Sequence, residues 1–395
     1  MKAVVYKGPH KVVIEDCKDP EITKPTDAIV KVTSAAICGS DLHMYEGRSP
    51  AGPDVVLGHE IMGVIEKVGP GVRQLKEGDR VVLPFNIGCG ECFNCVRGFT
   101  NACLFLNPDS AGAGYGYAGL GPYNGGQAEK VLVPFADFNA MKLPGKPYDE
   151  HEDDFLMIAD IFPTAWHATQ QAKVGIGKSV AIYGAGPVGL LSVMSAKLQG
   201  AGPIYIIDHN QDRLDLAKEM GAIPINFSTD NAVDFIADHQ AKLNSGSERR
   251  GEDKLRGVLC GIDAVGYQSL DFNDPGSEEH HGIIHQLAQV VDPTGDISLI
   301  GVYFPEDPGG NDENAKQGIL PVPVGLLWDK GISIGTGQCP VKLYDNFLRQ
   351  AVVTGQANPG KIVSHHISLD EAPEFYERFD KRETGVTKVV INPNK

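Results

Sequence analysis

The sequence predicts an α/β protein with two domains: an irregular β-barrel and a doubly wound parallel sheet. First, 395 residues exceed what one ordinary hydrophobic core organises. Second, short strand-like segments broken by Gly and Pro fill the chain as far as about Leu143. Third, strand and helix patterns alternate from residue 178 onward, which is typical of a parallel sheet covered on both faces.

The barrel is expected from the first part of the chain. Apolar and polar residues alternate in Ile29–Val32, as in a half-buried strand. Turn pairs such as Pro70-Gly71 and Gly78-Asp79 separate it from similar segments. The start of the chain also alternates like a strand and lacks the apolar core of a signal peptide.

A glycine turn predicts a dinucleotide site in the second domain. Gly184, Gly186 and Gly189 form G-x-G-x-x-G between a buried strand at 178–183 and a helix from Leu190. The first glycine would allow the tight turn, the second the approach of a pyrophosphate, and the third the packing of helix on strand. Free N–H groups at the helix start would bind the phosphates.

Asp208 ends the next predicted strand, about twenty residues after the glycine turn. A carboxylate at this point accepts the adenosine ribose hydroxyls and repels a 2′-phosphate, so NAD is favoured over NADP. Arg213 weakens this preference, because a guanidinium can pair with a phosphate.

Four of the eight cysteines crowd into one short lobe, residues 89–103. Cys89, Cys92, Cys95 and Cys103 follow the spacing C-x2-C-x2-C-x7-C. Four thiolates complete a tetrahedral zinc site, which would be structural and would fold a lobe that has few apolar residues. An iron–sulfur cluster and reactive thiols without metal are the alternatives; the spacing lacks the x3-Pro ending of a ferredoxin run.

Cys38 and His59 are the first two candidate ligands of a catalytic zinc ion. Zinc prefers thiolate and imidazole, and catalytic sites use three protein ligands plus one open position. Either residue alone could instead fill the core. Asp160 lies in an apolar run, where a buried carboxylate needs a cation or several donors. Capping the helix ahead of Pro163 is the competing interpretation.

The Gly/Tyr-rich segment 107–126 has two interpretations. It is a flexible loop, or its tyrosines Tyr115, Tyr117 and Tyr123 form a pocket wall, because long ordered loops often carry function. The charged, Ser/Gly-rich segment 244–254 is expected to be a solvated surface loop.

The formal net charge of −16 is spread along the chain. Such a surface argues against nucleic acid and against anionic membranes as partners. No apolar run approaches the roughly 18 residues that span a membrane. We therefore expect a soluble, cytoplasmic protein.

These motifs resemble those of the zinc-containing medium-chain alcohol dehydrogenases along essentially the whole chain. The matching segments are Cys38–Asp41, 58–60 with Gly63 and Gly69, 78–82, the cysteine lobe, 184–189 and 263–266. Within that superfamily the chain looks most like the glutathione-independent formaldehyde dehydrogenase and aldehyde dismutase branch. The pointers are Asp160 before Ile-Phe-Pro-Thr, the Gly/Tyr-rich loop and the segment 335–341.

The resemblance implies a GroES-like catalytic domain, 1–158 with 337–395, and a Rossmann domain, 159–336. In most of the superfamily the third catalytic ligand is a Cys or Glu, but in this branch it is an Asp, here Asp160. Catalytic zinc would bind Cys38, His59 and Asp160, with Glu60 either next to the ion or as an exchangeable fourth ligand. Structural zinc would bind the four-cysteine lobe. Ser40 and His43 match a proton relay. The implied cofactor contacts are Gly39, Ser40, His43, Gly184, Gly186, Pro187, Val188, Gly189, Asp208, Arg213, Thr336, Gly337 and Gln338.

The implied activity is NAD-dependent, zinc-dependent oxidation of hydrated formaldehyde or of another small aldehyde or alcohol, without glutathione. Alternatives within the superfamily are an alcohol or polyol dehydrogenase and an aldehyde dismutase. A non-catalytic nucleotide-binding relative is the alternative from another class. Two zinc ions per chain and a homo-tetramer are expected by resemblance.

Overall fold

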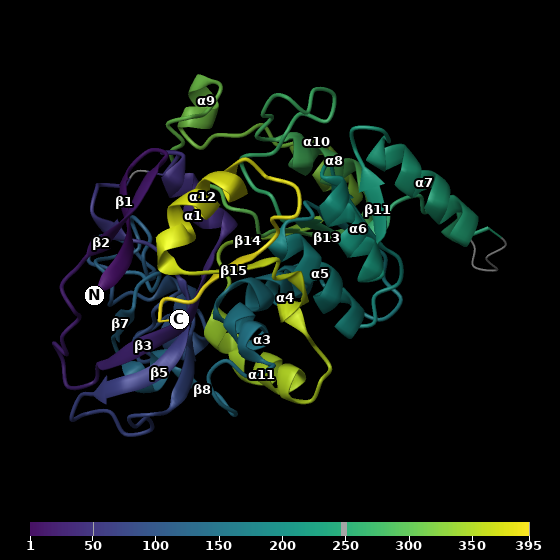
Figure 1. The fold of residues 1–395 in the computed structure, drawn as a ribbon. Helices are drawn as coiled ribbons and strands as arrows, with labels where there is room; N and C mark the ends of the chain where they lie inside the picture. The colour runs from purple at the N-terminus through teal and green to yellow at the C-terminus, as the bar shows by residue number, and fades with distance from the viewer. Residues whose placement is uncertain (50, 246–250, 395) are drawn as a thin grey trace. The chain divides into compact units, whose positions relative to one another are not determined.

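The computed structural model describes residues 1–49, 51–245 and 251–394 (Figure 1). Part of the predicted surface loop, 246–250, lies outside these residues. The chain divides into two compact units: Met1–Pro163 together with Cys339–Lys395, and Thr164–Gln338. The boundaries expected from the sequence, 158/159 and 336/337, stay a proposal. Within the described ranges, no helix is both long enough and apolar enough to cross a membrane.

The first unit is built on two sheets, ordered β2-β1-β4 and β15-β16-β3-β5-β6-β8, with β7 also paired to β3. All neighbouring strands are antiparallel except β15 and β16. The strands are β1 Lys2–Gly8, β2 Lys11–Asp16, β3 Ala28–Ile37, β4 Val55–Val56, β5 Glu60–Val68, β6 Arg80–Leu83, β7 Lys130–Val133, β8 Met141–Lys142, β15 His365–Ile367 and β16 Val389–Ile391.

The long pair β3 and β5 explains the curvature of this unit. Its register shifts twice along β3, between Ile29 and Val30 and between Val32 and Ser34. Such irregularities bend a strand and increase its twist, which lets one sheet curl around a single core. Buried side chains from β3, β5, β6 and β7 fill that core. The C-terminal strand β16 pairs with β3, so the end of the chain completes the sheet.

Short helices connect the strands of the first unit (Figure 1). The α-helices are α1 Gly39–Tyr45, α2 Ala136–Asn139, α3 Glu152–Leu156, α11 Asp345–Val353 and α12 Ala372–Asp380. The 3₁₀ helices are η1 Cys95–Arg97, η2 Thr100–Ala102, η3 Met157–Ala159, η5 Val341–Leu343, η6 Pro359–Ile362 and η7 Leu369–Glu371. Helix α4, Ile161–Gln171, follows η3; it begins in the first unit and from Thr164 onward belongs to the second. Pro163 lies in its first turn, where a missing N–H costs no helix bond.

The second unit contains a six-stranded parallel sheet of order β11-β10-β9-β12-β13-β14. The strands are β9 Val180–Tyr183, β10 Ile204–Asp208, β11 Ile223–Asn226, β12 Val258–Asp263, β13 Val291–Leu299 and β14 Ser333–Thr336. The helices are α5 Pro187–Leu198, α6 Gln211–Glu219, α7 Ala232–Leu243, the 3₁₀ helix η4 Glu252–Lys254, α8 Gly282–Val290, α9 Glu313–Lys316 and α10 Val324–Lys330.

Helices cover both faces of this sheet. Tyr183 and Ile207 face a core that also contains residues of α7, α8 and α10. Helices α5 and α6 pack on β9 and β10 as well, but their residues are not part of that core. Because side chains alternate across a strand, the two helix groups lie on opposite faces. The predicted fold class, a β-barrel domain with a doubly wound parallel sheet, is confirmed.

Candidate functional site

The strand pair β3 and β5 brings Cys38 and His59 together. Ala36 lies opposite Glu60 in the register, so the residue after β3 and the residue before β5 meet at one end of the pair. Asp160 joins them from the junction of η3 and α4. Its Oδ2 lies 3.2 Å from His59 Nε2 and 3.7 Å from Cys38 Sγ. The three predicted catalytic ligands therefore point at one another.

Glu60 completes this group of donor atoms. Ligand atoms of Cys38, His59, Glu60 and Asp160 all lie within 4.8 Å of one another, and all four residues are buried. Zinc binds sulfur, nitrogen and carboxylate oxygen of these types. The donor set thus has the chemistry and the compactness of a zinc site, with one donor more than the three that catalytic sites use.

Asp41, to which the sequence analysis assigned no role, supports the histidine. Its Oδ1 lies 3.1 Å from His59 Nδ1, so the imidazole turns its Nε2 toward Asp160. Asp41 Oδ2 accepts hydrogen bonds from the Cys38 amide and from Gln127 Nε2. Gln127 in turn accepts one from the Tyr376 hydroxyl. A carboxylate behind a metal-binding histidine fixes its tautomer and ring orientation. The only local signal for it was its place three residues after Cys38.

Lys388 is the second missed residue. Its Nζ lies 2.6 Å from Glu60 Oε1 and donates to the Ile37 carbonyl, and both charged side chains are fully buried. A buried charge of this kind needs a partner of opposite sign. Lys388 therefore neutralises one of the two carboxylates in the donor cluster, that of Glu60. Nothing near Lys388 in the sequence indicates this role.

The acid–base properties of the cluster reflect crowded charge. Burial and the Glu60 carboxylate raise the pKa of the Cys38 thiol. For His59, burial lowers the pKa, but the charge of Asp41 and hydrogen bonds to Asp160 and Asp41 outweigh it and raise the pKa well above its usual value. Acidic groups packed this closely favour positive charge in their midst. A divalent cation would satisfy that demand.

Ser40 and His43, the predicted proton relay, lie on helix α1. Ser40 Oγ is 3.3 Å from His59 Nε2, so the hydroxyl borders the donor cluster. His43 is buried one turn further along the same helix, and residues three apart lie on the same side of a helix. Of the loop tyrosines, Tyr117 lies beside His59, with ring centroids 6.4 Å apart. Tyr115 is buried in the core of the first unit instead.

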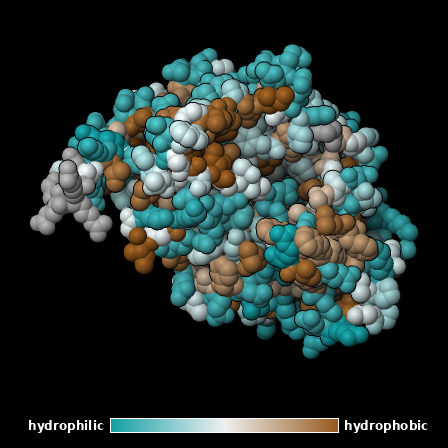
Figure 2. Space-filling view, turned by 180° about the vertical axis from the view of Figure 1, so that it is seen from behind, coloured by the Kyte–Doolittle hydropathy of each residue, from teal (hydrophilic) through white to brown (hydrophobic). Residues whose placement is uncertain are grey.

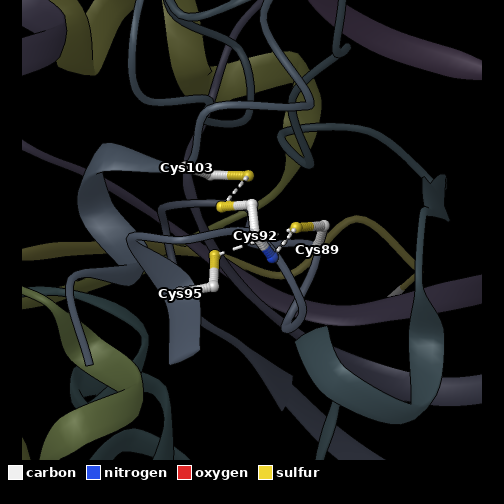
Figure 3. Close-up of side chains that lie close together, drawn as sticks. All are labelled: Cys89, Cys92, Cys95 and Cys103. Carbon is white, nitrogen blue, oxygen red and sulfur yellow. Dashed lines mark hydrogen bonds between the residues drawn. The ribbon is translucent and has the colours of Figure 1, made fainter. Parts of the chain in front are cut away.

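The four cysteines of the lobe converge on one point (Figure 3). Cys89 Sγ and Cys95 Sγ are 4.0 Å apart, as are those of Cys92 and Cys103. Disulfide sulfurs would lie about 2.05 Å apart, whereas four sulfurs about 2.3 Å from one ion lie about 3.8 Å apart. Burial raises the pKa of the Cys92 thiol. Hydrogen bonds from N–H groups, including that of Leu104, and from the neighbouring thiols outweigh burial and lower this pKa to about 6. The lobe therefore has the geometry of a tetrahedral thiolate site.

The glycine turn follows β9, and the local backbone explains why each of its three positions suits a glycine. Gly184 has φ +95°, a conformation that glycine adopts without strain. A Cβ on Gly189 would come within 1.8 Å of the Gly184 carbonyl, so only glycine lets α5 pack this close to the turn. A Cβ on Gly186 would meet open space, which leaves its backbone accessible. Pro187 and Val188 form the first turn of α5.

Asp208 ends β10 next to this turn. Its Oδ2 accepts a 2.6 Å hydrogen bond from the Ala185 amide inside the turn, and its Oδ1 accepts bonds from the amides of His209 and Asn210. A carboxylate has about four acceptor positions, so one remains for a ribose hydroxyl. Arg213 lies in the first turn of α6, and its amide donates to the side chain of the cap Asn210.

Strand β14 ends at Thr336, on the same carboxyl edge of the sheet, and is followed by Gly337 and Gln338. Ligands of doubly wound sheets bind along this edge. The predicted cofactor residues 184–189, 208, 213 and 336–338 thus share one edge of the second unit. The others, Gly39, Ser40 and His43, belong to the first unit with the metal donors.

Comparisons with known proteins find a family domain in the first part of the chain and relatives that match its full length. Residues 24–145 match the alcohol dehydrogenase GroES-like domain. Glutathione-independent formaldehyde dehydrogenases from Pseudomonas aeruginosa and Bacillus subtilis are 40% and 38% identical; the alignments cover 100% of this chain and 98% and 97% of theirs. A formaldehyde dismutase from Pseudomonas putida is 35% identical over 100% of this chain and 98% of its own.

Solved structures give the same picture. The alcohol dehydrogenase TADH from Thermus sp. ATN1 has a TM-score of 0.80 at 34% identity, with 100% of both chains covered. A zinc-binding dehydrogenase from Sinorhizobium meliloti bound to NADP has a TM-score of 0.73 at 25% identity, with 99% of both chains covered. Sequence, fold and donor geometry lead to one conclusion: the chain belongs to the zinc-type alcohol dehydrogenase family and is a dehydrogenase that uses zinc and a nicotinamide cofactor.

Proposed function

We propose that this enzyme oxidises hydrated formaldehyde, or another small aldehyde or alcohol, with NAD as hydride acceptor and without glutathione. The observation that carries the proposal is the convergence of Cys38, His59 and Asp160 on one point. Relatives named formaldehyde dehydrogenase at 38–40% identity support the choice of substrate.

We further propose two zinc ions per chain. The catalytic ion would be held by Cys38, His59 and Asp160. Glu60 would lie beside the ion, with its carboxylate paired to Lys388. The structural ion would be held by the four thiols of the lobe. Two separate donor clusters, each with residue types that zinc prefers, support this count.

Zinc and NAD, when bound, would supply a Lewis acid that lowers the pKa of the substrate oxygen and an acceptor for the hydride. The chain's own residues would remove the proton. Ser40 borders the donor cluster and would take the proton from the substrate hydroxyl, and His43 would receive it. Asp41 would hold the His59 ring in place throughout. Loss of this proton together with a hydride converts a hydrated aldehyde to an acid, and a primary alcohol to an aldehyde.

The substrate and the fate of the cofactor are tested by one turnover screen. Formaldehyde, short alcohols and polyols are compared with and without added NAD. We expect the highest kcat/KM with formaldehyde and dependence on added NAD. A preference for polyols would contradict the formaldehyde assignment. Turnover of formaldehyde without added NAD, to equal formate and methanol, would show a dismutase with retained cofactor, the activity for which the Pseudomonas putida relative is named.

The preference for NAD is tested at Asp208. Replacing it by alanine removes the acceptor for the ribose hydroxyls and the charge that repels a 2′-phosphate, so kcat/KM with NAD should fall about tenfold or more. The kcat/KM with NADP should change less, so the ratio of kcat/KM with NAD to kcat/KM with NADP should fall. Asp208→Asn keeps most of the side-chain shape near the Ala185 amide. This variant therefore separates the effect of the negative charge on cofactor binding from the effect of the side chain on the glycine turn. An unchanged cofactor ratio would count against the assignment.

We also propose a cytoplasmic homo-tetramer. All eight cysteines lie in the described residues and none of them forms a disulfide, which favours a reducing compartment. Hydrophobic side chains gather in separate patches on the face shown in Figure 2. Large apolar side chains are exposed on both units, among them Phe93 and Phe105 in the first and Ile176 and Trp328 in the second. Such patches often mark contacts between proteins. Light scattering of the purified enzyme measures the mass.

A further inference from the structure

Gln171, the last residue of α4, joins three elements of the second unit. Its Nε2 donates to the Thr336 carbonyl at 3.1 Å and lies 3.0 Å from His167 Nε2. Its Oε1 accepts a 2.7 Å hydrogen bond from Ser298 Oγ. Ser298 lies in β13 and Thr336 ends β14, so one amide ties the helix to two neighbouring strands.

The chemistry of the partners fixes the orientation of this amide. The Thr336 carbonyl only accepts hydrogen bonds, so the NH₂ group must face it. The second amide hydrogen then points to His167, whose Nε2 must accept it. Burial lowers the pKa of His167 to about 4, which keeps the ring neutral and able to accept at neutral pH. Both hydrogens and the oxygen of the Gln171 amide are therefore in use.

The backbone at the end of β14 is shaped around this side chain. A Cβ on Gly335 would come within 2.9 Å of Gln171 Cβ and 3.1 Å of its Cγ, so a larger residue there would displace Gln171. Gly337 has φ +104°, so the chain turns sharply just after the anchored carbonyl of Thr336. Gln171 thus holds the strand at the point where the turn 336–338 begins.

The position of this turn along the sheet edge indicates what it contacts. The glycine turn of β9 lies between β10, which ends in Asp208, and β12. A dinucleotide binds across such a switch point with its two halves on opposite sides. The adenosine half lies toward Asp208 and β10, which leaves the nicotinamide half on the side of β12, β13 and β14.

We infer that Gln171 is a positioning residue for the nicotinamide half of the cofactor, acting through the backbone of 336–338. The inference rests on the proposed NAD site. Without Gln171, the affinity for the nicotinamide half should fall while the affinity for the adenosine half should stay the same.

Gln171→Leu tests this claim, because leucine keeps much of the volume and none of the polar contacts. Calorimetric titration of the zinc-loaded protein should show the Kd for NAD rising about tenfold, as expected when hydrogen bonds that hold a binding segment are lost. ADP-ribose, which lacks the nicotinamide ring, should bind within about twofold of wild type. Gly335→Ala, which crowds Gln171, should give the same split and serves where Gln171→Leu does not fold.

Gln170→Leu is the matched control. Gln170 is exposed on the same helix, and its Nε2 donates to Gln199 Oε1, so both ligands should bind as in wild type. Equal weakening of NAD and ADP-ribose by Gln171→Leu would show a merely structural role and overturn the inference, as would unchanged NAD binding. A wild-type protein that binds neither ligand would instead refute the proposed NAD site itself.

Discussion

Replacing Asp160 by alanine is expected to abolish turnover while leaving about one zinc ion per chain. The carboxylate is the donor that approaches both His59 Nε2 and Cys38 Sγ, so its removal opens the catalytic cluster but leaves the four-cysteine lobe intact. Loss of a Lewis acid worth several kcal/mol corresponds to about a thousandfold or more in kcat. Metal content by mass spectrometry and steady-state rates measure the two effects.

Asp160→Cys is the matched variant for this experiment. Thiolate is a zinc ligand of similar reach, and the resemblance to the wider superfamily implies a Cys or Glu at this position in most members. We expect this variant to recover the second zinc ion and part of the activity. Full activity in Asp160→Ala, or loss of both zinc ions together, would contradict the assignment of Asp160.

Replacing Cys92 by serine is expected to prevent folding of the first unit rather than to impair catalysis alone. The lobe exposes much of its own apolar surface: Phe93 and Val96 are both 67% exposed, so these side chains add little to its stability. Binding of structural zinc contributes about 10–16 kcal/mol in small zinc-binding peptides, and that energy is folding energy. The expected results are low soluble yield and a large fall in the thermal midpoint.

Cys17→Ser serves as the control for the lobe, because Cys17 is a partly buried free thiol outside both donor clusters. It should fold, bind two zinc ions and unfold at nearly the wild-type temperature. If Cys92→Ser were as stable as this control, the lobe would not depend on a metal, and reactive thiols would become the better interpretation.

Local patterns predicted the parts of the fold and site that depend on local sequence. The glycine turn needs a strand before it and a helix after it, and both are visible as apolar periodicity, so the doubly wound sheet was predictable. The cysteine spacing encodes the convergence of four thiols in the same way. The pairing of β16 with β3 and the register shifts of β3 follow from packing between distant segments.

The residues that sequence reasoning missed are held by long-range contacts. Lys388 and Glu60 are 328 positions apart, and the Tyr376–Gln127 hydrogen bond behind Asp41 spans 249. No periodicity links such pairs, although a lysine buried beside a carboxylate is evident once the chain has folded. The tyrosine loop shows the same limit: Tyr117 lies near His59, whereas the Tyr123 hydroxyl donates to the Leu106 carbonyl.

The central claim is that Cys38, His59 and Asp160 hold a catalytic zinc ion. Its most direct test is an anomalous difference map from crystals of the zinc-loaded enzyme, recorded on both sides of the zinc absorption edge. We predict one peak among the four lobe thiols and a second about 2.0–2.3 Å from Cys38 Sγ, His59 Nε2 and an Asp160 oxygen. A map from a fully loaded protein with no peak at those three side chains, or with the second ion bound elsewhere, would contradict it.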